Sequence, residues 1–119
     1  MARVTTIPYL NREIVQIDFN GCTPGTYGPV IQEALGALSG RPPRTVLALT
    51  LLQNVRFDPN TAIEMERFAR QAQPYLKANA LVGIEGLKKV VFLGIKPLYR
   101  TPVELFDVVD AAKQWLAER

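Results

Sequence analysis

The stretch Val46–Thr61, VLALTLLQNVRFDPNT, decides the fold. It opens with Val46–Leu52, an apolar run whose length and composition are typical of a strand buried on both faces, as in the middle of a parallel sheet. The polar residues that follow end in Asp58-Pro59. This pair predicts a helix start, because Asp accepts hydrogen bonds from first-turn N–H groups and Pro suits the first helical position. Open α/β sheets place their sites at the carboxyl ends of such strands, so we expect the loop Gln53–Thr61 to be the functional surface.

The remaining segments supply neighbours for this strand. Val4–Leu10 and Glu13–Phe19 predict two strands joined by a tight turn at Asn11-Arg12. Pro8 has no N–H for a sheet ladder, so we expect the first strand to be an edge. Two more strands are predicted at Ala80–Ile84 and Thr101–Phe106. Four helices are predicted. The first has Pro29 in its first turn and runs to about Leu38, and the others are Asp58–Lys77, Leu87–Leu98 and a last one that Asp107 caps and that includes Leu116.

Helical spacing also predicts which side chains face inward. In the second helix these are Ala62, Met65, Ala69, Ala72 and Leu76. In the last helix they are Val108, Ala112 and Trp115, with Val109 and Leu116 beside them. The resulting order is β-β-α-β-α-β-α-β-α. It predicts a single α/β domain over residues 1–119, with a five-stranded mixed, mostly parallel sheet and four helices.

Composition excludes several classes of function. The 119 residues are 48% hydrophobic and 21% charged, which is ordinary for one globular domain. The chain has no histidine, so a histidine-dependent nucleophile and the usual zinc sites are excluded. No phosphate-binding glycine motif is present. We therefore expect no enzymatic activity, no metal and no cofactor.

Location and charge are also constrained. A single cysteine, Cys22, cannot form an intrachain disulfide, which favours a cytoplasmic protein. We expect neither a signal peptide nor a transmembrane segment, because no apolar run is long enough. The net charge of +3 is weak support for nucleic-acid binding, which we do not expect.

One basic run stands out between Gly86 and Thr101. It contains Lys88, Lys89, Lys96 and Arg100, with Phe92 spaced by four from two of the lysines. Two interpretations are open. The lysines are the solvated face of a helix with Phe92 folded onto the core, or the residues form a docking patch for an acidic partner or an anionic head group. An exposed Phe92 stripe also predicts a homodimer.

Several motifs together resemble the STAS domain, the fold of the anti-sigma-factor antagonists. They are Gly21 after the second strand, Val55-Arg56-Phe57-Asp58 before the second long helix, Ala80–Leu87 (ALVGIEGL), Phe106-Asp107 and Ala111–Leu116 (AAKQWL). The resemblance covers nearly the whole chain. It is nearest to a branch of bacterial proteins that are also likened to lipid-transfer domains. It implies a regulatory module that binds another protein.

The sequence departs from the antagonists at the regulated helix start. There the family has Asp-Ser-Ser-Gly, and a kinase phosphorylates one of the serines to break a protein complex. This chain has Asp58-Pro59-Asn60-Thr61, without a serine, so the resemblance leaves Thr61 alone as a candidate phosphorylation site. The departure removes support for the switch and leaves the fold prediction unchanged.

Two functions remain open from the sequence. The first is a protein-interaction module whose partner binds Asn54, Arg56, Phe57, Asp58, Asn60 and Thr61. The second is a carrier of an apolar or amphipathic small molecule, with the helix Leu87–Leu98 as a lid whose cations hold an anionic head group or contact a membrane surface.

Overall fold

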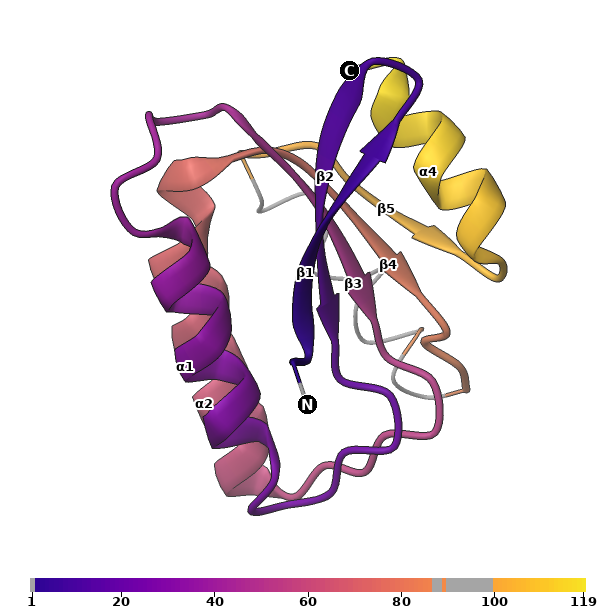
Figure 1. Cartoon of the computed structure of the whole chain (residues 1–119). Helices are drawn as coiled ribbons and strands as arrows, with labels where there is room; N and C mark the ends of the chain where they lie inside the picture. The colour runs from indigo at the N-terminus through magenta and orange to yellow at the C-terminus, as the bar shows by residue number, and fades with distance from the viewer. Residues whose placement is uncertain (1, 87–88, 90–99) are drawn as a thin grey trace.

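The computed structural model describes residues 2–86, 89 and 100–119. Its strands are β1 Val4–Tyr9, β2 Arg12–Asp18, β3 Val46–Leu51, β4 Leu76–Val82 and β5 Val103–Phe106. They form a five-stranded sheet in the order β1-β2-β3-β4-β5 (Figure 1). The β1–β2 pair is antiparallel and the other three pairs are parallel. The predictions of a mixed sheet and of β1 as its antiparallel edge are therefore confirmed.

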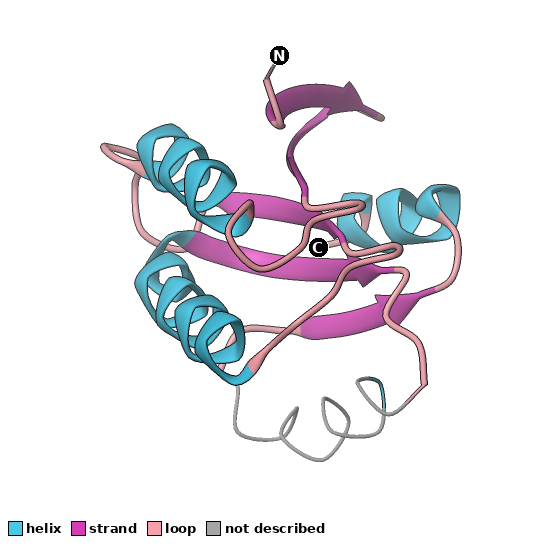
Figure 2. Ribbon diagram, turned by 90° about the horizontal axis from the view of Figure 1, so that it is seen from below, coloured by secondary structure: helices cyan, strands magenta, loops and turns pink. Residues whose placement is uncertain are grey.

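The described residues contain three α-helices, α1 Tyr27–Leu38, α2 Pro59–Ala72 and α4 Val109–Ala117. Helices α1 and α2 lie side by side on one face of the sheet, and α4 covers the other face (Figures 1 and 2). The sequence predicted four helices. The additional one, Leu87–Leu98, lies outside the described residues.

The central strand β3 is buried along its whole length. Its side chains alternate between two cores, because successive residues of a strand point to opposite faces. Leu47, Leu49 and Leu51 pack with α4, whereas Ala48 belongs to the core under α1 and α2. The prediction that Val46–Leu52 is buried on both faces is confirmed.

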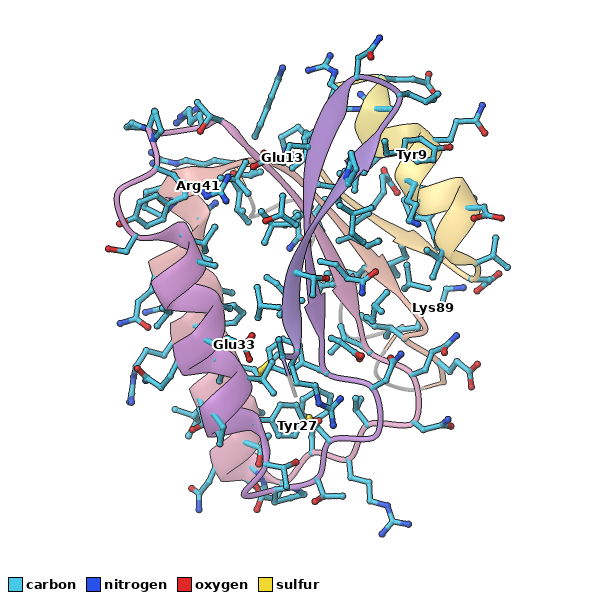
Figure 3. The ribbon with its side chains drawn as sticks, viewed as in Figure 1. Tyr9, Glu13, Tyr27, Glu33, Arg41 and Lys89 are labelled. Carbon is cyan, nitrogen blue, oxygen red and sulfur yellow. The ribbon has the colours of Figure 1, made fainter. Side chains whose placement is uncertain are left out.

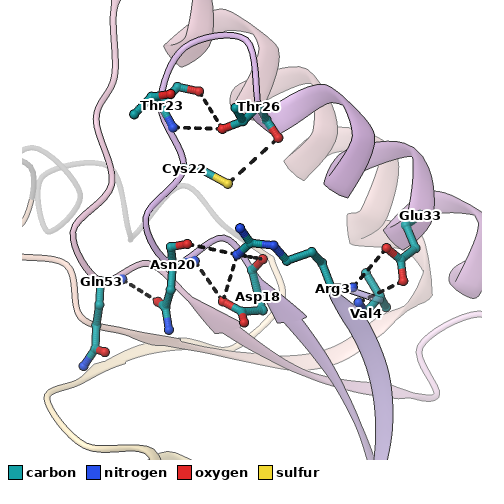
Figure 4. A network of polar contacts seen from close by, with 9 residues as sticks. All are labelled: Arg3, Val4, Asp18, Asn20, Cys22, Thr23, Thr26, Glu33 and Gln53. Atoms are coloured by element: carbon teal, nitrogen blue, oxygen red, sulfur yellow. Dashed lines mark hydrogen bonds and ion pairs between the residues drawn. The ribbon is translucent and has the colours of Figure 1, made fainter. Parts of the chain in front are cut away.

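The edge strand β1 is held at its start by α1. The carboxylate of Glu33 accepts hydrogen bonds from the main-chain N–H of Arg3 (3.1 Å) and of Val4 (3.0 Å) (Figures 3 and 4). The N–H of Asp18 donates to the oxygen of Arg3. The main-chain N–H and C=O groups of every second residue from Val4 onward, which include those of Thr6 and the C=O of Pro8, therefore point away from β2. Because Val4 is bonded to Glu33 and Pro8 has no N–H, this edge offers few donors to another strand.

The predicted second helix was too long at its C-terminus. It ends at Ala72, a 3₁₀ turn Gln73–Tyr75 follows, and β4 begins at Leu76. Pro74 is the physical reason, because it has no N–H for an i→i−4 bond and its ring clashes with the preceding turn. Leu76 is therefore the first residue of a strand, and not part of a helical stripe.

The inward face of α2 agrees in part with the predicted one, because Ala72 is buried and Met65 packs against the core. Its buried residues are Thr61, Phe68 and Ala72, whereas Ala62 is exposed. The helix begins one residue after Asp58. Its largest apolar side chain, Phe68, faces the sheet. The alanines repeat at helical spacing, but their small side chains offer little apolar area to bury, so they do not determine which face of the helix points inward.

The start of the last helix was predicted one residue too early. The N-cap is Val108, not Asp107, and Val108 is 59% exposed instead of sealed against the sheet. Its oxygen accepts the N–H of Ala112. Ala112 and Leu116 are fully buried and Trp115 packs against the same core, as predicted.

Candidate interaction surface at the carboxyl end of the sheet

Two loops meet at the carboxyl ends of β2 and β3. The main-chain N–H of Gly21 donates to the oxygen of Gln53 (2.9 Å), and the N–H of Arg56 donates to the oxygen of Cys22 (2.9 Å). The side chain of Asn20 adds a third link, because its Oδ1 accepts the N–H of Gln53 at 2.7 Å (Figure 4). These bonds hold the loop before α2 against the loop before α1.

Asp58 caps the first turn of α2. Its backbone is extended (φ −114°, ψ 175°), and its Oδ1 accepts the N–H of Thr61 at 2.7 Å. Pro59 follows at the first helical position, as the sequence predicted. A hydrogen bond from the hydroxyl of Thr61, and to a smaller extent one from its main-chain N–H, holds the pKa of Asp58 below its ordinary value. A carboxylate therefore stands at the helix start at neutral pH.

A row of aromatic rings connects this surface with the core. Phe57, which is 37% exposed, stacks on Tyr27 with ring centroids 5.4 Å apart and an interplanar angle of 23°. Tyr27 is fully buried and packs on Phe19, which in turn contacts Phe68. The hydroxyl of Tyr27 donates to the main-chain oxygen of Arg56 at 2.9 Å, and burial, followed by the nearby thiol of Cys22, raises its pKa to about 12.

A shallow hollow of about 420 Å³ opens beside the start of α2. Its wall combines apolar side chains with charged ones of both signs. It is lined by Pro24, Gly25, Asp58, Asn60, Thr61, Ile63, Glu64 and Arg67. Ile63 is 56% exposed, so it presents apolar surface to solvent about one and a half helical turns from Asp58.

The predicted partner-binding residues occupy neighbouring positions in this region, but they are not equally accessible. Asn54, Arg56 and Phe57 are exposed on the loop before α2, with Asn54 in the left-handed region at φ 57°. Asn60 is exposed in the first turn of the helix. Thr61, the candidate phosphorylation site, is only 4% exposed. Its hydroxyl reaches a kinase only if the first turn of α2 opens.

The predicted basic patch is described only in part. Lys88, Phe92 and Lys96 lie outside the described residues. Lys89 follows Gly86, beyond the carboxyl end of β4, and Arg100 precedes the amino end of β5. The patch and the Phe92 stripe remain predictions.

Three lining residues, Ile63, Glu64 and Arg67, were not among the predicted site residues. A usable signal was present, because Asn60, Ile63 and Arg67 are spaced three and four apart and so share one face of a helix. The stacking of Phe57 on Tyr27 had no such signal, since Phe57 lies in the loop before α2 and Tyr27 is the first residue of α1.

No model of a known protein family matches this chain, and no curated protein matches it either. Among solved structures it resembles an uncharacterized protein of the DUF3478 family from Shewanella loihica PV-4, described as having a SpoIIAA-like fold. The TM-score is 0.79 at 15% identity, and the alignment covers 95% of this chain and 91% of that one. The fold is the SpoIIAA-like fold of STAS domains.

The STAS fold is thus shared without close sequence similarity, and the predicted resemblance is confirmed at the level of the fold. Within the described ranges, no group of three or more acidic or cysteine side chains is placed to hold a metal ion. In those same ranges, no helix is long and apolar enough to span a membrane.

Proposed function

We propose that this chain is a regulatory protein-interaction module without enzymatic activity, and that its partner binds the surface formed by the loop before α2 and the first turns of that helix. The observation that carries the proposal is Phe57, a large aromatic side chain that is exposed but rigidly supported by the buried ring of Tyr27. Aromatic side chains dominate the energetics of many interfaces, and an anchor held in place before binding loses little entropy.

The surroundings of Phe57 support the same function. The hollow, which is lined by the next residue, Asp58, offers apolar contact from Ile63 and Pro24, and Glu64 and Arg67 add charge to its wall. This combination of an apolar centre and a polar rim is usual at non-obligate protein interfaces. The SpoIIAA-like fold is consistent with this interpretation.

The test is capture of the partner from cells that contain the native gene, followed by measurement of its Kd with purified proteins. We expect Phe57→Ala to weaken binding by about 2 kcal/mol or more, roughly thirtyfold, as for an interface hot spot. Asn60→Ala should weaken it less, because Asn60 is a polar residue of the hollow's wall.

Val108→Ala is the matched control. Val108 is another exposed apolar side chain, but it precedes α4, which covers the opposite face of the sheet. Equal loss of the partner from Phe57→Ala and Val108→Ala would contradict the assignment of the surface. Retention of full affinity by Phe57→Ala, with an unchanged melting temperature, would remove Phe57 as the anchor.

We further propose that this surface works without the phosphoserine switch of the antagonists. Thr61 lies in the first turn of α2, where the antagonists carry their phosphorylated serine, and it is buried. Mass spectrometry of protein from its native cells should find Thr61 unmodified, and Thr61→Ser should bind the partner with unchanged affinity. A phosphate on Thr61 that alters partner affinity would contradict this.

The carrier function has no observation in its favour among the described residues. The hollow next to α2 is shallow and about half polar in character, whereas small-molecule sites are enclosed and mostly apolar. Its predicted lid, Leu87–Leu98, lies outside the described residues except for Lys89, so the carrier function remains a prediction.

A further inference from the structure

The β1–β2 turn carries a residue that folding alone does not explain. Leu10 and Asn11 are the two turn residues, since Tyr9 pairs with Arg12, and both have positive φ (47° and 63°). Such turns favour Asn, Asp or Gly, because a bulky side chain in the left-handed region is strained. Leu10 is moreover 69% exposed. A strained and exposed leucine suggests selection for a contact outside the chain.

The side chains around Leu10 come from the hairpin and from the end of α4. The ammonium of Lys113 lies 6.0 Å from the ring centroid of Tyr9, which Figure 3 places next to α4. Arg12 donates from Nη2 to the main-chain oxygen of Arg119 at 2.6 Å. The hairpin–α4 surface is defined by Tyr9, Leu10, Arg12, Lys113, Trp115 and Arg119.

This surface carries several cations. The guanidinium of Arg119 lies 4.5 Å from the ring centroid of Trp115, and a second hollow of about 330 Å³ is lined by these two residues, by Arg100 and by one carboxylate, that of Glu104. The ion pairs found among the described residues involve Arg3, Arg41 and Arg70, not the arginines or lysine of this surface.

We propose that the hairpin–α4 surface docks the protein on an anionic lipid membrane. Leu10 enters the interfacial region, the half-buried rings of Tyr9 and Trp115 lie at headgroup level, and the cations contact lipid phosphates. Amphipathic aromatic rings and basic side chains around a small apolar tip are the usual composition of such contacts.

The composition favours a bilayer over a protein partner. A protein interface of ordinary size has a buried apolar centre made by several residues. Here one leucine is exposed at a turn, and the other members of the surface are cations and two half-buried aromatic rings. A bilayer accepts a single protruding side chain and supplies a continuous negative surface for the cations.

The test is flotation of the purified chain with vesicles, using phosphatidylcholine alone or phosphatidylcholine and phosphatidylglycerol in equal parts. We expect binding to the anionic vesicles only, stronger at low ionic strength than at about 0.15 M salt. Trp115 is the single tryptophan, so its emission should shift to the blue on binding.

Two variants separate the apolar and the ionic parts of the contact. Leu10→Asn should weaken binding to anionic vesicles about tenfold, because it removes the inserted side chain and suits the turn. Lys113→Gln should weaken it about fivefold, the contribution of one cation near an anionic surface. Val108→Asn and Arg70→Gln are the matched controls and should bind as the unchanged chain does.

Three results would overturn the proposal. The first is failure of the unchanged chain to float with anionic vesicles at low ionic strength. The second is full binding by Leu10→Asn, which would leave only non-specific charge attraction. The third is loss of an acidic protein partner from Leu10→Asn without any vesicle binding, which would assign the surface to a protein. None of these measurements depends on the partner proposed for the α2 surface.

Discussion

The α2 surface and the hairpin–α4 surface, at opposite ends of the sheet, are joined chiefly by different kinds of interaction. At the carboxyl end, main-chain bonds such as Gly21 to Gln53 and Arg56 to Cys22 join the loops that precede α1 and α2. At the amino end, the β1–β2 turn is joined to α4 through side chains, with Arg12 bonded to Arg119 and Lys113 next to Tyr9.

This difference bears on what each end binds. Main-chain bonds fix the shape of a loop whatever the exposed side chains are, so the surface near α2 is suited to a partner with a defined shape. Long basic side chains on the hairpin–α4 surface adjust to a fluid array of phosphates.

The largest effect is expected from Gly83→Ala, at the end of β4. Gly83 has φ +96°, and a Cβ there would lie 3.0 Å from the main-chain nitrogen of Gln53. Backbone strain and this close contact together should lower the free energy of unfolding by about 3 kcal/mol. Chemical denaturation measures the change.

Gly36→Ala is the control for the glycine substitution. Gly36 lies inside α1, and a Cβ at that position meets nothing within 4 Å. The variant should raise the free energy of unfolding by about 1 kcal/mol, because alanine is the better helix former. If both glycine variants destabilised the protein equally, the contact between the β3 and β4 ends would not be the cause.

A smaller loss is expected from Tyr27→Phe, which removes one hydroxyl from beneath the α2 surface. The oxygen of Arg56 loses a buried donor at 2.9 Å, so the free energy of unfolding should fall by about 1 kcal/mol. The ring that supports Phe57 remains. Partner affinity should therefore fall much less than in Phe57→Ala, and equal losses in both variants would show that the loop backbone, not the ring of Phe57, makes the contact.

Local chemistry was sufficient to predict much of this architecture from the sequence. The apolar run Val46–Leu52 and the Asp58-Pro59 pair each act within a few residues, and both were predicted correctly. Pro74 was harder, since a proline near a helix end is compatible with a kink or a stop. The choice depends on β4, which begins at Leu76 and pairs with β3.

The features that organise the two surfaces depend on contacts between distant segments. Tyr27 is buried at the start of α1, but nothing near it in sequence indicates that Phe57 stacks on its ring. The position of α4 beside the β1–β2 turn follows from the whole sheet, so the grouping of Arg12 with Arg119 was not predictable from periodicity. Leu10 itself was assigned to a strand, because its apolar side chain continued the preceding pattern.

The charge of Asp58 should contribute to stability in a pH-dependent way. Its pKa is lower in the folded chain than the ordinary value of 3.8, so its stabilisation is present above that pH and is lost as the pH falls through the folded pKa. Asp58→Asn keeps an oxygen that caps the helix but has no charge. The melting temperature of the variant should be lower at neutral pH and should approach that of the unchanged chain in acid, and a constant difference would contradict a role for the charge.

The smallest change in stability is expected from Leu10→Asn, and this substitution should stabilise the protein, unlike Gly83→Ala, Tyr27→Phe and Asp58→Asn. Asparagine tolerates positive φ, so the variant should gain about 0.5 kcal/mol in the free energy of unfolding while binding to anionic vesicles weakens. Chemical denaturation and flotation of the same preparation measure both quantities. A gain in stability with a loss of binding would mean that the leucine is kept for its contact with the membrane at a cost to the fold. If stability also fell, Leu10 would be packing within the protein. The contrast between the α2 surface, which main-chain bonds hold, and the hairpin–α4 surface, which side chains form, would then no longer hold.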